Sequence, residues 1–234
     1  MPIAAVNGVE LDYLAEGSGP PLLVIGGSGG RQPTPAPLVE RFTTLSYAQR
    51  EQGRSSKLGR PSTMADYADD AAALIRYAGW ERAHVVGISF GWRVAQHLAI
   101  GHPAAVDRLV LCCTSPGGPD HSSAPFHELG PGAALQLLDT RGTFEIGEGS
   151  FEPANDDLLA ARATHDVVAR LGEIAAPTLL CAGRYDGIAP LANSERMAAG
   201  IPDARLDVFD GGHAFFVQDA RAWPAIVDFL EARA

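Results

Sequence analysis

Ser89 lies between two glycines, in the stretch "HVVGISFGWRVAQHLA" that covers residues 84–99. The residues before Ser89 form an apolar run typical of a β-strand, and those after it have the pattern of a helix. A sharp turn from strand to helix strains the serine backbone, and flanking glycines remove the Cβ atoms that would clash there. The G-x-S-x-G pattern is short enough to arise by chance. Its setting, however, favours a nucleophilic serine over one that only caps a helix.

A serine hydroxyl reacts readily only when a nearby base accepts its proton. Among the seven histidines, His213 in "FDGGHAFF" follows the last predicted strand, and the two glycines before it allow the loop to turn toward Ser89. We therefore expect His213 to be the base. The other histidines fall within or beside predicted strands and helices, or in an insertion described below: His84, His97, His102, His121, His127 and His165.

A catalytic histidine needs a carboxylate that fixes its tautomer and stabilises its charged form. Asp186 in "LLCAGRYDGIAP" comes just after a predicted strand, whereas Asp207 lies inside a strand and Asp210 is close along the chain to His213. Asp120, in the loop after the preceding strand, is the alternative. The sequence thus predicts the catalytic residues Ser89, Asp186 and His213.

The elements that must position these residues alternate between strand and helix. Asn7-Gly8 between two short runs predicts a β-hairpin. Further strands are expected at 22–25, 42–47, 84–88, 106–113, 178–182 and 205–209, and helices at 64–78, 90–100, from about 191 and from 223 onward. This order predicts an α/β fold with a mostly parallel, twisted sheet and helices on both faces. Parallel sheets bind ligands at the carboxyl ends of their strands.

Residues 115–169 break the alternation, because they are rich in glycine, proline and short helical pieces. We expect them to form a small lid over the carboxyl edge of the sheet, with residues 1–114 and 170–234 forming the core. The indole of Trp92 is expected to lie along this lid and beside Ala48. The residues predicted to line a substrate pocket are Gly27, Trp92, Phe126, Phe144 and Phe215.

Composition excludes several classes of function. Lys and Arg total 18 and Asp and Glu total 28, so a net charge of −10 argues against nucleic acid or an anionic membrane as partner. No apolar run approaches the ~18 residues of a membrane span. The start lacks the pattern of a secretion signal, and Cys112, Cys113 and Cys181 lie in apolar runs as buried thiols do, so we expect a cytoplasmic protein. No metal-ligand cluster or phosphate-binding loop is recognisable, and we expect no metal or cofactor.

Several stretches resemble α/β-hydrolases that carry a lid, in particular enol-lactone hydrolases and cofactor-free haloperoxidases or esterases. "PPLLVIGGSGG" resembles the segment that usually reads His-Gly-x after the third strand, and "LSYAQREQGRSS" resembles the Asp-x-Arg-Gly-x-Gly-x-Ser loop. "CTSPGG" and "GGHAFFVQDARAWPAIVDFL" also look like family members. The order Ser…Asp…His is the order of this family.

The resemblance implies an α/β-hydrolase fold and roles for particular residues. It makes Ser89 the nucleophile, Asp186 the acid and His213 the base, and it assigns the oxyanion hole to the backbone N–H groups of Ser28 and Phe90. The sequence departs from the family pattern at Gly26, where histidine is usual, at Ala48 and Glu51, which replace Asp and Gly, and at Trp92, which replaces a small residue.

We therefore expect a serine hydrolase that cleaves a small-molecule carboxylic ester or lactone through an acyl-enzyme. Two alternatives remain open. The same triad on this fold can run perhydrolysis as in haloperoxidases, C–C bond hydrolysis or a lyase step. A non-catalytic small-molecule receptor of the same fold is the other. The sequence does not indicate the oligomeric state.

Overall fold

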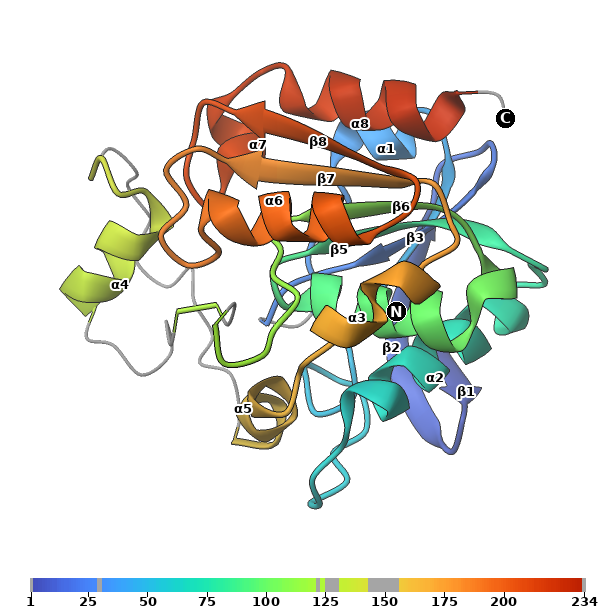
Figure 1. Cartoon of the computed structure of the whole chain (residues 1–234). Helices are drawn as coiled ribbons and strands as arrows, with labels where there is room; N and C mark the ends of the chain where they lie inside the picture. Colours follow the sequence, from blue (N-terminus) through green and yellow to red (C-terminus); the bar gives the residue numbers. More distant parts are fainter. Residues whose placement is uncertain (1, 29–30, 121–122, 125–130, 143–155, 233–234) are drawn as a thin grey trace.

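One twisted sheet organises the molecule (Figure 1). The structure, a computed structural model, describes residues 2–28, 31–120, 123–124, 131–142 and 156–232. Within these residues, eight strands pair in the order β1-β2-β4-β3-β5-β6-β7-β8. Their bounds are β1 Ile3–Val6, β2 Val9–Glu16, β3 Pro21–Ile25, β4 Thr43–Tyr47, β5 Ala83–Ile88, β6 Val106–Cys112, β7 Thr178–Gly183 and β8 Ala204–Phe209.

The predicted hairpin and parallel sheet are both confirmed. β1 and β2 pair antiparallel around Asn7 and Gly8, whose φ angles of 47° and 74° suit a two-residue turn. β2 also runs antiparallel to β4, whereas every later neighbour in the sheet pairs parallel. The parallel strands bring their carboxyl ends to one edge of the sheet.

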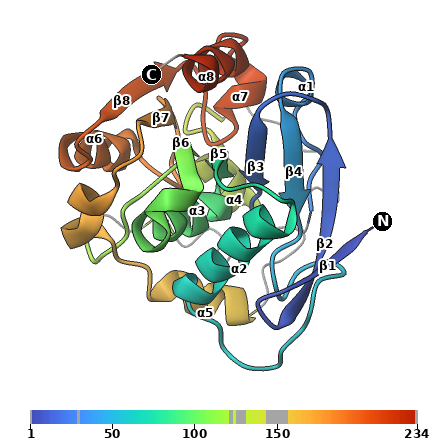
Figure 2. The ribbon, with the colours of Figure 1, turned by 90° about the vertical axis from the view of Figure 1, so that its right-hand side faces the viewer.

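Helices cover both faces of the sheet, as predicted (Figure 2). One face carries α2 (Met64–Tyr77), α3 (Phe90–Gly101) and α6 (Leu191–Gly200), and the other carries α1 (Ala36–Val39), α7 (Phe215–Gln218) and α8 (Ala222–Glu231). α2 begins with a capping box in which the Thr63 hydroxyl accepts from the N–H of Asp66 while the Asp66 carboxylate accepts from the N–H of Thr63.

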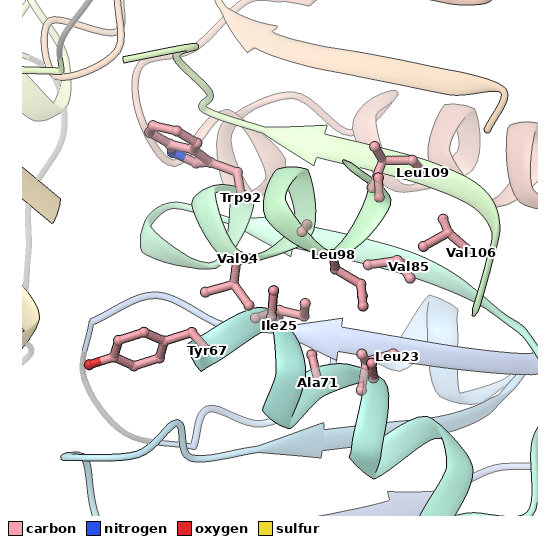
Figure 3. Packing of buried hydrophobic residues seen from close by; sticks show 14 of the residues in the cluster. Leu23, Ile25, Tyr67, Ala71, Val85, Trp92, Val94, Leu98, Val106 and Leu109 are labelled. Atoms are coloured by element: carbon pink, nitrogen blue, oxygen red, sulfur yellow. The ribbon is translucent and has the colours of Figure 1, made fainter. Parts of the chain in front are cut away.

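The core follows from the alternation of side chains along the strands. In β3, Leu23 and Ile25 belong to the cluster beneath α2 and α3, whereas Leu22 and Val24 belong to the cluster beneath α8. Figure 3 shows the first cluster, in which Val85, Val94 and Leu98 pack with Leu23 and Ile25. Among the described residues, no helix combines the length and apolarity that a membrane crossing needs.

The described parts of segment 115–169 include α4 (Pro131–Leu138) and α5 (Asp156–Ala163), followed by the 3-10 helix Val168–Glu173 that begins within the segment. α4 lies beyond the carboxyl ends of β7 and β8 (Figure 1). A β-bridge between Gly117 and Asp166 joins the two ends of the segment. This placement agrees with a lid over the carboxyl edge, although the division into lid and core stays a prediction.

Candidate active site

Ser89 occupies a strained corner between β5 and α3. Its φ of 52° and ψ of −123° lie outside the regions that L-residues usually adopt. A Cβ atom on Gly91 would lie 2.0 Å from the carbonyl oxygen of Ile25, and one on Gly87 would lie 2.8 Å from the Cβ of Ala95. Both glycines of G-x-S-x-G are therefore required by close packing, which holds the serine at the carboxyl edge of the sheet.

The structure brings the three predicted catalytic side chains into one hydrogen-bonded chain. The Nε2 atom of His213 lies 3.0 Å from the Oγ of Ser89, and its Nδ1 lies 2.9 Å from the Oδ2 of Asp186. The Asp186 side chain is 1% exposed and that of His213 is 12% exposed. This geometry matches a nucleophile, a base and an orienting carboxylate.

The surroundings of Asp186 fix its direction. Its Oδ1 accepts from the backbone N–H groups of Ile188 and Ala189 at 2.8 and 2.9 Å, which leaves Oδ2 for His213. Because the carboxylate accepts from Nδ1, Nε2 is left as an acceptor facing the serine hydroxyl. Asp120, the alternative acid, is exposed and makes no described contact with His213.

The loop that carries His213 is anchored to α4 and to Cys113, the residue after β6. The backbone N–H of His213 donates to the carbonyl of Leu138 at 2.6 Å, and a Cβ on Gly212 would lie 1.9 Å from that same oxygen. The thiol of Cys113 donates to the His213 carbonyl at 2.6 Å. Two segments far apart in sequence thus position the imidazole, and no sequence pattern indicated the Cys113 contact.

Cys113 also lies close to the carboxylate and the imidazole. Atoms of Cys113, Asp186 and His213 that could ligate a metal lie within 4.8 Å of one another. Burial, and secondarily the charge of Asp186, raise the pKa of the Cys113 thiol, which keeps it protonated. Since Asp186 and His213 already bond each other, we interpret these groups as the triad Ser89, His213 and Asp186, with the Cys113 thiol holding the His213 backbone.

The predicted oxyanion loop faces the serine. A Cβ on Gly27 would lie 3.3 Å from the Cβ of Ser89, and Ser28 follows Gly27 directly. Phe90 is the first residue of α3, where backbone N–H groups lack partners within the helix. The amide of Gln49 donates to the carbonyl of Gly26 at 3.1 Å, so this buried side chain supports the loop from below.

The departures from the family loop are compensated by other contacts. Glu51 takes a φ of 66°, a conformation that favours the glycine usual at this place, and its carboxylate accepts from the N–H of Leu58 at 2.7 Å. The N–H of Ala48 donates to the carbonyl of Asp12 at 2.8 Å, and its carbonyl accepts from the hydroxyl of Ser55 at 2.6 Å. The loop is thereby held without the usual aspartate.

Comparison with known proteins identifies the family. The model of the family described as "alpha/beta hydrolase fold" matches residues 20–158, more than half of the chain. The chain belongs to the α/β-hydrolases. A protein of Caulobacter sp. (strain K31), assigned as the carbamate hydrolase RutD, is 30% identical over an alignment that covers 90% of this chain and 89% of that protein.

Solved α/β-hydrolases superpose over nearly the whole chain. The enol-lactonase from Burkholderia xenovorans LB400 has a TM-score of 0.85 at 25% identity and covers 99% of this chain and 100% of its own. A meta-cleavage product hydrolase from Pseudomonas fluorescens IP01 has a TM-score of 0.82 at 21% identity, with 98% and 97% covered. At that identity, the second likeness shows the fold alone.

The other described histidines of this α/β-hydrolase lie in structural contacts away from Ser89. His84 pairs with Asp107 at 3.3 Å and His102 with Asp69 at 2.7 Å. His97 and His165 contact each other, with 3.2 Å between Nε2 and Nδ1.

The structure corrects one part of the expectation for Trp92. Its ring is 1% exposed and meets His165 of segment 115–169 edge-to-face at 5.1 Å, so the predicted contact with the lid segment is present. The expected place beside Ala48 is wrong. The loop after Ala48 packs on α2 through Arg50 and Asp70, whereas the Trp92 ring points away from α2 (Figure 3). The indole is part of the core on the side of α3 that faces away from α2.

The remaining pocket predictions have different outcomes. Phe215 is fully buried and stacks on Phe209 at 4.9 Å, so its described contacts are packing contacts in the cluster beneath α8. Gly27 lies against Ser89, as stated above. Phe126 and Phe144 fall outside the described residues.

Proposed function

We propose that this chain is a serine hydrolase that cleaves a carboxylic ester or lactone through an acyl-enzyme. The observation that carries the proposal is the continuous hydrogen-bonded chain from Ser89 through His213 to Asp186 at the carboxyl edge of the sheet. A triad acts by coupling the nucleophile to a base whose tautomer is fixed. The likeness to an enol-lactonase at 25% identity supports an ester-type bond.

Each step can be assigned to a group in this site. The Oγ of Ser89 attacks the carbonyl carbon while its proton passes to the Nε2 of His213, and the carbonyl electron pair moves onto oxygen. The N–H groups of Phe90 and Ser28 are the proposed donors to that oxyanion. As the tetrahedral species collapses, the alkoxide leaves and takes the proton from Nε2. Water then attacks the acyl-enzyme with His213 as base, which releases the acid and restores the hydroxyl of Ser89.

Turnover of p-nitrophenyl esters from acetate to octanoate, together with a simple γ-lactone, tests this proposal. The wild type is expected to hydrolyse members of this set, and Ser89→Ala to lose on the order of 10⁶-fold in kcat while keeping its fold. A folded wild type without turnover of any ester or lactone would favour the receptor alternative. Turnover that persists in Ser89→Ala would overturn the assignment of the nucleophile.

Carbamate hydrolysis is the second candidate, because a relative assigned as a carbamate hydrolase is 30% identical over most of this chain. The same attack on a carbonyl applies, with Nε2 protonating a leaving amine in place of an alkoxide. A matched pair of an N-alkyl carbamate and the corresponding ester distinguishes the two candidates. A higher kcat/KM for the carbamate would replace the ester by the carbamate as the proposed substrate class.

The three cysteines bear on the compartment in which the enzyme acts. Cys112, Cys113 and Cys181 are free thiols buried in the fold, as is usual in a reducing environment. We propose that the enzyme acts on its small-molecule substrate in the cytoplasm, which localisation of a tagged chain in the native host would test.

A further inference from the structure

A cavity lies beside α3, between that helix and described parts of segment 115–169. Its volume is about 570 Å³, and the described residues that line it include Arg93, Ser123, Arg162, His165 and Asp166 but neither Ser89 nor His213. Arg93 follows Ser89 by four residues, which is about 6 Å along the helix axis. The described lining of the cavity therefore excludes the triad serine and histidine, although Arg93 lies about one helical turn after Ser89.

Arg93 is a buried cation that has no carboxylate partner among the described residues. It is 6% exposed, and its Nη2 donates to the hydroxyl of Ser123, while its Nε finds no acceptor. Its guanidinium stacks on the Trp92 ring at 3.9 Å, which fixes its plane. A buried charge without an opposite charge costs free energy, so this residue is retained at a cost to stability.

Arg50 shows how the same molecule pairs an arginine that serves the fold. It is 2% exposed, and its Nε and Nη2 each donate to Asp70 at 2.7 Å. Although burial opposes it, this pairing raises the pKa of Arg50. Burial and the neighbouring Arg162 instead lower the pKa of Arg93 well below its usual value. An anion bound beside Arg93 would remove that penalty.

Further charged and titratable groups are found among the described residues that line the cavity. Arg162 donates to the carbonyls of Ser123 and Ala124, next to Arg93. Burial and the charge of Arg93 lower the pKa of His165 to about 2, so this imidazole stays neutral. Asp166 is the carboxylate among the described lining residues, and its Oδ1 accepts from the N–H of Val168 at 3.0 Å. The described lining residues thus include two arginines and one aspartate.

We propose that this cavity binds the carboxylate of a small molecule through the guanidinium of Arg93. A guanidinium recognises a carboxylate with two parallel N–H···O bonds, and the Nε of Arg93 has a donor to offer. The carboxylate can belong to the substrate, several bonds from the carbonyl that Ser89 attacks, or to a separate metabolite. The first source rests on the proposed function, and the second does not.

Binding of succinate to Ser89→Ala protein tests the site without turnover, with uncharged succinamide as control. Calorimetry is expected to show succinate binding that weakens on the order of tenfold to a hundredfold when Arg93→Met is added. Arg170→Met, which removes an exposed cation, is the matched control and should bind as before. Without ligand, Arg93→Met should melt no lower than its parent, because it removes an unpaired buried charge.

If Arg93→Met does not fold, Arg93→Gln serves in its place, because it keeps a polar side chain while removing the charge. Succinate binding that survives either folded variant would overturn the proposal. So would equal binding of succinamide, or no succinate binding at all.

The source of the carboxylate follows from a ratio of rates. In the wild type and Arg93→Met, kcat/KM is measured for mono-p-nitrophenyl glutarate and for p-nitrophenyl butyrate. If the ratio of kcat/KM for the glutarate ester to kcat/KM for the butyrate ester is at least about tenfold lower in Arg93→Met than in the wild type, the site binds the acid group of the substrate. An unchanged ratio, with succinate binding still dependent on Arg93, assigns it to a separate carboxylate. Failure of both esters to react would count against the proposed function and leave the binding result intact.

Discussion

Asp70 and Asp186 are two buried carboxylates, each with a side chain about 1% exposed, and they differ in what they bind. Asp70 on α2 accepts from the guanidinium of Arg50 at 2.7 Å and from the amide of Asn7 at 2.8 Å. Asp186 accepts from two backbone N–H groups and from the imidazole of His213. The first has a permanently charged partner, and the second has a partner that can gain a proton.

The difference distinguishes a buried carboxylate that joins elements of the fold from one that orients a catalytic base. The bonds of Asp70 join the hairpin β1–β2, the loop after β4 and helix α2, so their loss should separate these elements. The described bonds of the Asp186 side chain fix one imidazole against Ser89 and join two N–H groups of its own loop. Replacing each aspartate should therefore affect a different measured quantity.

Asp186→Asn should give the largest effect, on activity. The amide oxygen can still accept from the N–H groups of Ile188 and Ala189, but its NH₂ group donates to Nδ1 of His213 and moves the proton to Nε2. We expect kcat to fall on the order of 10⁴-fold, with the denaturation midpoint nearly unchanged. Asp120→Asn is the control and should lose little. Equal losses in the two variants would contradict the assignment of Asp186.

Asp70→Asn should give the opposite result. It removes the carboxylate that accepts from the Nε and Nη2 of the buried Arg50 and leaves Asp66, 3.7 Å from Nη1, as the remaining carboxylate partner. Breaking a buried ion pair typically costs about 3–5 kcal/mol of the free energy of unfolding. Urea denaturation measures this loss, and Asp69→Asn, on the exposed side of the same helix, is the matched control. Ester turnover well below the midpoint should stay within a few-fold of wild type. A stable Asp70→Asn protein would show that the ion pair does not hold these elements together.

His97, which is half-buried, and His165, which is buried, extend the comparison to polar groups that carry no charge. Burial, with Arg170 as the lesser cause, lowers the pKa of His97 to about 4, and burial, with Arg93 and His97, lowers that of His165 to about 2. Below about pH 6.5 the unfolded chain binds protons on both residues that the folded protein does not bind. Their contribution to stability is thus present above pH 6.5 and is lost as the pH falls, toward about 4 for His97 and toward about 2 for His165.

Urea denaturation at pH 7, 6 and 5 checks this dependence. Between pH 6.5 and 5 the pair should account for a loss of roughly 1–3 kcal/mol, and His97→Gln should reduce the slope. His102→Gln replaces a histidine outside the pair and should leave the slope nearly unchanged. A slope that His97→Gln does not alter would show that this pair is not the source of acid sensitivity.

The features that the sequence predicted correctly are those that depend on residues close together along the chain. The hairpin at Asn7-Gly8, the elbow at Ser89 and the strands of the parallel sheet each follow from a local pattern of glycines or apolar residues. His213 and Asp186 could be chosen because parallel strands bring their following loops to one edge. These predictions needed the order of the strands but no details of packing.

Contacts between distant segments could not be predicted in this way. The ion pair of Arg50 and Asp70, and the bond from Cys113 to His213, join residues that no local pattern connects. The predicted place of Trp92 was wrong for the same reason. Its ring lies on the side of α3 away from α2 and contacts His165, and both neighbours are distant from Trp92 in the sequence.

Labelling with a fluorophosphonate tests the central claim most directly, because the probe forms a bond only with an activated serine. Peptide mass spectrometry should place one phosphonyl adduct on Ser89 of the wild type and none on Ser89→Ala, with slower labelling of Asp186→Asn. An adduct on another serine, or a folded wild type that stays unlabelled at high probe concentration, would contradict the account.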